Sequence, residues 1–167
     1  ELTYAGQDVA VTETATSFVN ERQKVKISLE KILEQDEIFG IGKNNEIKNI
    51  SFGLYAKEDV VSSSGTVIPA DGLIEIITLD ENEAATANTD LPFGSYYIKE
   101  IATDEHYILS DIQYPFTFKY AGQDTETVEI KVNDGKPIEN KLIYGSVSGK
   151  KIDENGEVLG GALIGIF

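Results

Sequence analysis

An amine, a carboxylate and an amide stand at positions where the sequence predicts buried apolar side chains. Lys31, Glu100 and Asn140 each keep the alternating register of hydrophobic residues in a different predicted strand. A polar or charged group on an inward face is unfavourable unless it has a partner. Because a lysine and a glutamate can exchange a proton and an asparagine can hydrogen-bond to both, we expect the three side chains to form one site.

Two stretches of sequence position Lys31 and Glu100. Residues 25–33 are apolar at alternate positions, which predicts a strand, and Lys31 falls in the apolar register. Residues 91–109, LPFGSYYIKEIATDEHYIL, open with a Pro-Phe-Gly turn and continue as a strand in which Glu100 shares a face with Tyr96. Taken alone, such a glutamate would be interpreted as a strand-end carboxylate that reaches water. The lysine and the asparagine offer it a buried partner instead.

Asn140 lies in the last predicted strand, residues 138–144. Ile138, Leu142 and Tyr144 are expected on one face, and Asn140 points with them. The three polar groups therefore come from the beginning, middle and end of one unit. The fold must bring distant strands together to build the site.

Composition predicts an all-β protein that does not bind nucleic acid. Hydrophobic residues make up 41% of the 167, enough for a core, and β-branched and aromatic residues recur in short runs between glycines, asparagines and aspartates. With 29 acidic and 14 basic residues, the net charge of −15 argues against nucleic-acid binding, which needs a basic surface. The absence of cysteine excludes disulfides, thiol catalysis and thiolate zinc sites.

Membrane insertion is not expected from the sequence. No run approaches the roughly 18 apolar residues of a transmembrane helix, and the N-terminus lacks a basic-then-apolar signal. The start at Glu1 and the lack of methionine suggest a fragment of a longer protein.

An internal repeat organises the chain. The sequence YAGQD at residues 4–8 returns at residues 120–124. In each copy an asparagine precedes a lysine by eleven positions: Asn20 and Lys31, then Asn140 and Lys151. Beyond these lysines, SFGLY at residues 51–55 corresponds to LIGIF at residues 163–167.

The repeat predicts one complete unit between two incomplete ones. Residues 1–22 are interpreted as the last strands of a preceding repeat, residues 23–144 as the complete domain, and residues 145–167 as the first strands of a following repeat, with a turn at residues 153–156. Because unpaired strands tend to find partners, we expect the two end segments to pair with each other or with neighbouring molecules.

Short strands at regular spacing within the central unit predict a sandwich of two sheets. We expect a long loop at residues 36–48, one helical turn within residues 80–90, and a hairpin turn at Asn133-Asp134-Gly135. The expected strands are residues 25–33, 50–56, 67–68, 72–79, 95–101, 107–109, 115–120, 127–132 and 138–144.

The chain resembles the Cna B-type, or SpaA-like, domains of Gram-positive surface adhesins and pilins. The resemblance rests on the strand with Lys31 followed by SFGLY at residues 51–55, on the segment at residues 91–109, and on the last strand with Asn140. Two features depart from the family pattern. Twenty-one residues separate the lysine from Gly53, and the glutamate segment ends in His-Tyr where Gly-Tyr is usual.

The resemblance implies an Ig-like (prealbumin-like) β-sandwich of antiparallel strands, closed by a spontaneous isopeptide bond. In this interpretation Lys31 is the nucleophile and Asn140 the electrophile, and Glu100 is the general acid and base; Lys26 lies nearby on the opposite face. Burial disfavours the charged amine, and a carboxylic acid can shuttle protons while ammonia leaves. Asn20 and Lys151 would be crosslink partners of the incomplete flanking repeats. The alternative is a buried Lys31–Glu100 ion pair with Asn140 hydrogen-bonded beside it.

The function implied by the resemblance is that of a stalk or spacer module in an adhesin or pilin at the bacterial cell wall. Its partners would be neighbouring repeats of the same chain. The alternative is an adhesive module that binds a host extracellular protein or glycan, for which the loop at residues 36–48 is the candidate. No enzyme acting on an external substrate is expected.

No cofactor or metal site is predicted. His106, the only histidine, has no serine or cysteine nucleophile beside it and is interpreted as a loop residue. Residues 153–157 lack the full ligand spacing of a calcium loop, so a β-turn is expected there. The acidic residues 80–83 could bind a divalent ion weakly, but a solvated acidic loop is the default interpretation.

Overall fold

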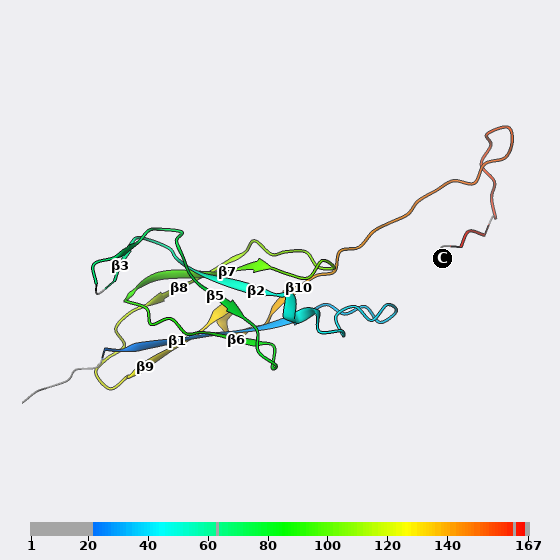
Figure 1. The fold of residues 1–167 in the computed structure, drawn as a ribbon. Coiled ribbons are helices and arrows are strands. Elements are labelled where there is room, and N and C mark those ends of the chain that lie inside the picture. The colour runs from blue at the N-terminus through cyan, green and yellow to red at the C-terminus, as the bar shows by residue number, and fades with distance from the viewer. Residues whose placement is uncertain (1–21, 63, 162, 166–167) are drawn as a thin grey trace, which may run out of the picture.

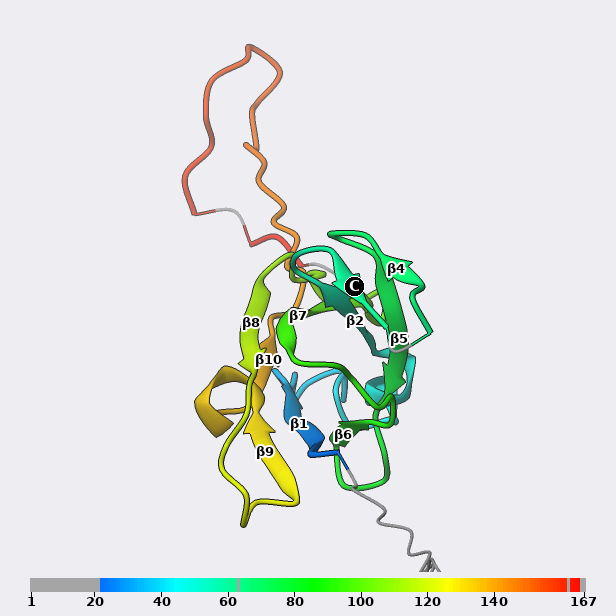
Figure 2. The same ribbon diagram turned by 90° about the vertical axis from the view of Figure 1, so that its left-hand side faces the viewer.

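A computed structural model describes residues 22–62, 64–161 and 163–165. Two four-stranded sheets pack face to face, as Figure 1 shows from the side and Figure 2 after a quarter turn. Regular helix in the described residues is confined to two short 3-10 segments, η1 (Glu46–Asn49) and η2 (Val132–Gly135). The predicted all-β sandwich is confirmed.

The first sheet is built around the longest strand of the sandwich, β1 (Lys24–Leu33). One edge of β1 pairs antiparallel with β6 (Ala84–Ala87). Its other edge pairs in parallel with β9 (Thr127–Lys131) along the first half and with β10 (Ile138–Asn140) along the second. The chain therefore enters the sandwich at one end of β1 and leaves it beyond β10 at the other end (Figure 1).

The second sheet is antiparallel throughout and carries the strand with Glu100. Its order is β5-β2-β7-β8, and a separate two-stranded ribbon, β3-β4, lies between β2 and β5 in the sequence. The bounds are β2 (Ser51–Ala56), β3 (Val60–Val61), β4 (Val67–Ile68), β5 (Leu73–Thr78), β7 (Gly94–Ala102) and β8 (Gln113–Phe118).

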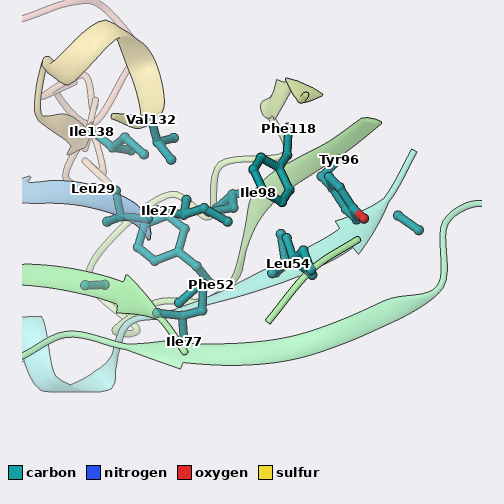
Figure 3. Packing of buried hydrophobic residues seen from close by; sticks show 14 of the residues in the cluster. Ile27, Leu29, Phe52, Leu54, Ile77, Tyr96, Ile98, Phe118, Val132 and Ile138 are labelled. Atoms are coloured by element: carbon teal, nitrogen blue, oxygen red, sulfur yellow. The ribbon is translucent and has the colours of Figure 1, made fainter. Parts of the chain in front are cut away.

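The core lies between the sheets and follows from the alternation of side chains along each strand. In Figure 3, Ile27 and Leu29 of β1 face Phe52 of β2 and Ile98 of β7. All four side chains are at most 4% exposed. Because the inner face of each strand is apolar, the polar groups of the site are surrounded by hydrocarbon.

Three expectations about local elements were wrong. Asn133-Asp134-Gly135 does not close a hairpin, because β9 and β10 both pair with β1 and never with each other. It forms a left-handed turn in η2, with φ of 55° at the asparagine and 54° at the aspartate. This turn connects β9 to β10, which pair in parallel with successive parts of β1. The helical turn expected within residues 80–90 is replaced by β6, and residues 107–109 contribute a single bridge between Tyr107 and Leu142.

The last strand is also shorter than predicted. It ends at Asn140, and Tyr144 is 69% exposed instead of sharing the inner face. Beyond it, residues 145–161 and 163–165 run away from the sandwich (Figure 1) and carry one bridge, Ile152 with Val158, closed by a turn in which Asp153 Oδ1 accepts hydrogen bonds from the backbone.

The expected pairing of the two ends involves residues 1–21, which lie outside the described residues. In the part of the chain that the structure describes, no helix is long and apolar enough to cross a membrane.

Candidate functional site

The parallel pairing of β1 with β10 sets Lys31 and Asn140 on one face of the first sheet. Lys31 is paired with Ile138, and Leu33 is paired with Asn140. Because side chains two residues apart share a face, the lysine and the asparagine are diagonal neighbours on adjacent strands. Both point inward, with exposures of 0% and 1%. Lys26 points outward and is exposed, so it takes no part in this cluster.

Glu100 reaches the cluster from the opposite sheet. It stands near the end of β7, on the same inner face as Tyr96 and Ile98, and only 1% of it is exposed. The structure thus brings together the lysine, the glutamate and the asparagine that sequence analysis singled out, from the first, seventh and last strands.

Lys31 has few hydrogen-bond acceptors around its amine. Its Nζ donates hydrogen bonds to the backbone carbonyls of Ile32 and Ile138, both at 3.1 Å, and lies 3.9 Å from Glu100 Oε1. Burial lowers the pKa of Lys31 from 10.5 to about 8, although the nearby carboxylates of Glu100 and Glu139 act in the opposite direction. About one tenth of such amines are neutral at pH 7, so a nucleophilic form is accessible near neutrality.

The side-chain amide of Asn140 is held through its nitrogen. Nδ2 donates to Glu100 Oε1 at 2.8 Å, to Oε2 at 2.9 Å and to Thr103 Oγ1 at 2.9 Å. Its oxygen, Oδ1, is buried without a hydrogen-bond partner. A buried polar atom without a partner is unfavourable, so this amide is under-satisfied as it stands.

The carboxylate of Glu100 is oriented from two sides. Besides the amide of Asn140, its Oε2 accepts a hydrogen bond from the backbone N–H of Ser110 at 3.0 Å. The carboxylate therefore hydrogen-bonds the amide nitrogen directly and lies 3.9 Å from the amine. A group in that position can accept a proton from one nitrogen and deliver it to the other.

Sequence reasoning missed two residues that contact the trio. Thr103 and Ser110 lie beyond the end of β7, where the alternation that identified Glu100 no longer applies. Their contacts depend on how the chain turns after the strand, for which the residue pattern gives no rule.

The flanking residues Asn20 and Lys151 are not brought together with the trio. Asn20 lies outside the described residues, and Lys151 is exposed on the segment after the sandwich.

His106 lies in a separate polar cluster. Its Nδ1 contacts Asp104 Oδ1 at 2.6 Å, and Asn49 Nδ2 donates to the other oxygen at 2.6 Å. This hydrogen bond to Asp104 raises the pKa of His106. Within residues 22–62, 64–161 and 163–165, no three histidine, aspartate or glutamate side chains are grouped to hold a metal ion.

Comparison with known families identifies the fold. Residues 39–136, more than half of the chain, match the SpaA family, a prealbumin-like fold domain. The chain belongs to the SpaA family. The resemblance to SpaA-like domains is thereby confirmed. The matched range contains Glu100, while Lys31 precedes it and Asn140 follows it.

The solved structures that the chain resembles include three bacterial proteins of low sequence identity. One is the minor pilin GBS52 of Streptococcus agalactiae, with 18% identity and a TM-score of 0.45 over 77% of this chain and 49% of that chain. Another is the pilus 2b backbone protein of group B streptococcus, with 18% identity and a TM-score of 0.43 over 79% of this chain and 47% of that chain. The third is the Bacillus anthracis TIE protein, with 17% identity and a TM-score of 0.45 over 84% of this chain and 24% of that chain. The SpaA chain spans less than half the length of each. No curated protein matches the sequence.

Proposed function

We propose that this SpaA domain is a structural module of a bacterial surface pilin or adhesin, covalently closed by an isopeptide bond between Lys31 and Asn140. The observation that carries the proposal is the buried contact of three groups from distant strands. The amide nitrogen of Asn140 donates hydrogen bonds to both carboxylate oxygens of Glu100, and the amine of Lys31 lies 3.9 Å from the same carboxylate.

The chemistry balances with the groups present. The neutral Nζ of Lys31 attacks Cγ of Asn140, and Glu100 accepts a proton from Nζ as the new N–C bond forms. Glu100 then delivers that proton to Nδ2, the Cγ–Nδ2 bond breaks, and ammonia leaves. The carboxylate returns to its starting state, and packing in the core supplies the proximity that makes an amide react with an amine.

The alternative of an unreacted ion pair is weaker on energetic grounds. A buried pair must offset the desolvation of both charges, and here Nζ and Oε1 are 3.9 Å apart, beyond hydrogen-bond distance. Condensation removes the amine charge and leaves a neutral amide that Glu100 can hydrogen-bond. The under-satisfied amide of Asn140 and the lowered pKa of Lys31 both favour that outcome.

The bond would make the domain a rigid link in a longer chain. Because β1 is the first strand of the sandwich and β10 the last, tension would pass through the crosslink and bypass the strands between them. Residues 23–144 would be the complete unit, with residues 1–22 and 145–167 belonging to neighbouring repeats and Asn20 and Lys151 to their crosslinks. We place this stalk outside the cell, at a Gram-positive cell wall.

Intact mass tests the proposal. The purified chain is expected to weigh less than its sequence by one ammonia, about 17 Da. Glu100→Gln, Lys31→Met and Asn140→Ala should each restore the full mass, whereas the control Lys26→Met, at an exposed position on the same strand, should keep the loss. A wild-type chain at its full sequence mass would refute the crosslink.

The exposed loop between β1 and η1 supports a second candidate, an adhesive role. Ile38 and Phe39 at its tip are 84% and 78% exposed, and Asp36 Oδ1 fixes their backbone by accepting both N–H groups. An ordered loop that presents two large apolar side chains fits contact with a host extracellular protein or glycan. Ile38→Ser with Phe39→Ser should abolish binding to host-cell matrix in a plate assay; unchanged binding would exclude the loop.

A further inference from the structure

The amide of Asn140 has a partner outside the proposed catalytic trio. Thr103 Oγ1 accepts a hydrogen bond from Asn140 Nδ2 at 2.9 Å. Thr103 follows the end of β7 and is half-buried, so its hydroxyl lies at the rim of the site, three residues after Glu100. The hydroxyl of Thr103 exchanges no proton in the proposed condensation.

This contact completes the anchoring of the amide plane. Nδ2 carries two hydrogens, and the two oxygens of Glu100, at 2.8 and 2.9 Å, take up one direction of donation. A single anchor would let the amide pivot about that hydrogen bond, because the terminal torsion of asparagine is broad. The hydroxyl of Thr103 supplies the second direction, and two directions define a plane. The carbon of the amide is then presented to its attacker in one orientation.

The same contact concerns the atom that departs. Nδ2 leaves as ammonia if Lys31 and Asn140 condense, and it must gain a proton from Glu100 while its bond to carbon lengthens. A hydroxyl that accepts a hydrogen bond from Nδ2 keeps the nitrogen beside the carboxylate during that step. No other described side chain bonds to Nδ2, so removal of Thr103 would leave Glu100 as its only side-chain anchor.

We propose that Thr103 is a positioning residue for isopeptide formation, acting through its hydroxyl on the leaving nitrogen of Asn140. The inference rests on the proposed crosslinking function and adds a fourth side chain to it. Because small misplacements of reacting groups lower rates by up to about 100-fold, loss of the hydroxyl should slow bond formation by about 10- to 100-fold without preventing it.

The test follows the loss of ammonia in time. The full chain is made in a short cell-free pulse, and intact mass is recorded at intervals for wild type, Thr103→Val and Thr103→Ser. Valine keeps the shape and removes the hydroxyl, whereas serine keeps the hydroxyl. We expect Thr103→Val to lose ammonia 10- to 100-fold more slowly than wild type and to reach the same final mass, and Thr103→Ser to stay within about threefold of wild type.

A matched background separates positioning from folding. In Asn140→Ala, which cannot crosslink and lacks the amide, adding Thr103→Val should leave the denaturation midpoint unchanged, because the hydroxyl has lost its partner. A lowered midpoint in that background would assign the slow reaction to folding and overturn the role. Equal rates for wild type and Thr103→Val, or equal slowing by valine and serine, would also overturn it. A wild type that keeps its full mass would refute the crosslink itself.

Discussion

At the scale of single residues, the behaviour of the site depends on the amine of Lys31. Its partners are two backbone carbonyls and a carboxylate 3.9 Å away, too few to replace the water that an ammonium group loses on burial. The pKa of about 8 expresses that deficit. Two predictions follow from the direction of the shift, one for the reaction and one for stability.

Crosslinking should accelerate as the pH rises toward 8 and level off above about 9. The neutral fraction of Lys31 increases from about one tenth at pH 7 to about one half at pH 8, so the rate of ammonia loss should rise about fivefold over that interval. Pulsed synthesis followed by mass measurement at pH 6, 7, 8 and 9 gives the profile. A rate that is constant, or that falls, over this range would show that deprotonation of the amine is not required.

A chain that cannot crosslink should gain stability in alkali. The pKa of Lys31 is lowered from 10.5 to about 8 by burial in the folded chain, and Asn140→Ala leaves that burial in place, so its unfolded state should bind more protons between these values. The cost of burying the Lys31 amine lowers the free energy of unfolding by its full amount below pH 8, and this cost disappears as the pH rises toward 10.5. The total gain in the free energy of unfolding is about 3 kcal/mol. Urea denaturation at pH 7 and 10 measures the gain.

The control for this gain is the double variant Asn140→Ala with Lys31→Met. It lacks the amine but keeps the buried tyrosines, such as Tyr96, whose pKa burial raises to about 12 and which therefore oppose folding above pH 10. The difference between the two variants isolates the lysine. An identical pH dependence of the free energy of unfolding in both variants would mean that burial does not lower the pKa of Lys31.

At the scale of elements, the two sheets hold the site by packing apolar side chains around it. Phe52 of β2 is paired in register with Glu100 of β7 and is fully buried, and Figure 3 shows its ring in the hydrophobic core beside Ile27 and Ile77. The outer edge of the same sheet is different, since Ile76 of β5 is 58% exposed. The two positions provide a matched test of how the packing of this sheet contributes to stability.

Phe52→Ala should destabilise the domain by about 3–5 kcal/mol, because a large cavity opens next to the site. Ile76→Ala, on the exposed side of β5, should change stability by less than about 1 kcal/mol. Both are best measured by urea denaturation in the Asn140→Ala background, where no crosslink masks the loss. Similar effects of the two substitutions would contradict the packing described for β2.

At the scale of the whole molecule, a bond between β1 and β10 would close a covalent loop over nearly the entire sandwich. The sequence has no cysteine, so this bond would constrain the unfolded chain in the way that disulfides do in other proteins. For a loop of about 100 residues, the chain-entropy model used for disulfides gives about 4.7 kcal/mol of stabilisation.

Pulling on single molecules should reveal the closed loop. Wild-type chains stretched from their ends should never release the segment between Lys31 and Asn140, whereas Asn140→Ala should unfold with an added length of roughly 360–390 Å, at 3.3–3.6 Å per residue. Release of that length by the wild-type chain would refute the proposal that the crosslink carries the tension.

The sequence by itself determined the all-β class, the position of most strands and the inward face of Lys31, Glu100 and Asn140. These features follow from the two-residue period of a strand, which can be recognised within a short stretch of sequence. Only the tertiary structure decided that β9 and β10 both lie parallel to β1, that β6 replaces a helical turn, and that Thr103 and Ser110 contact the site. Those outcomes depend on which distant strands pair and on how the chain turns after β7. Long-range pairing is selected by the burial of the whole core, and no local pattern encodes it.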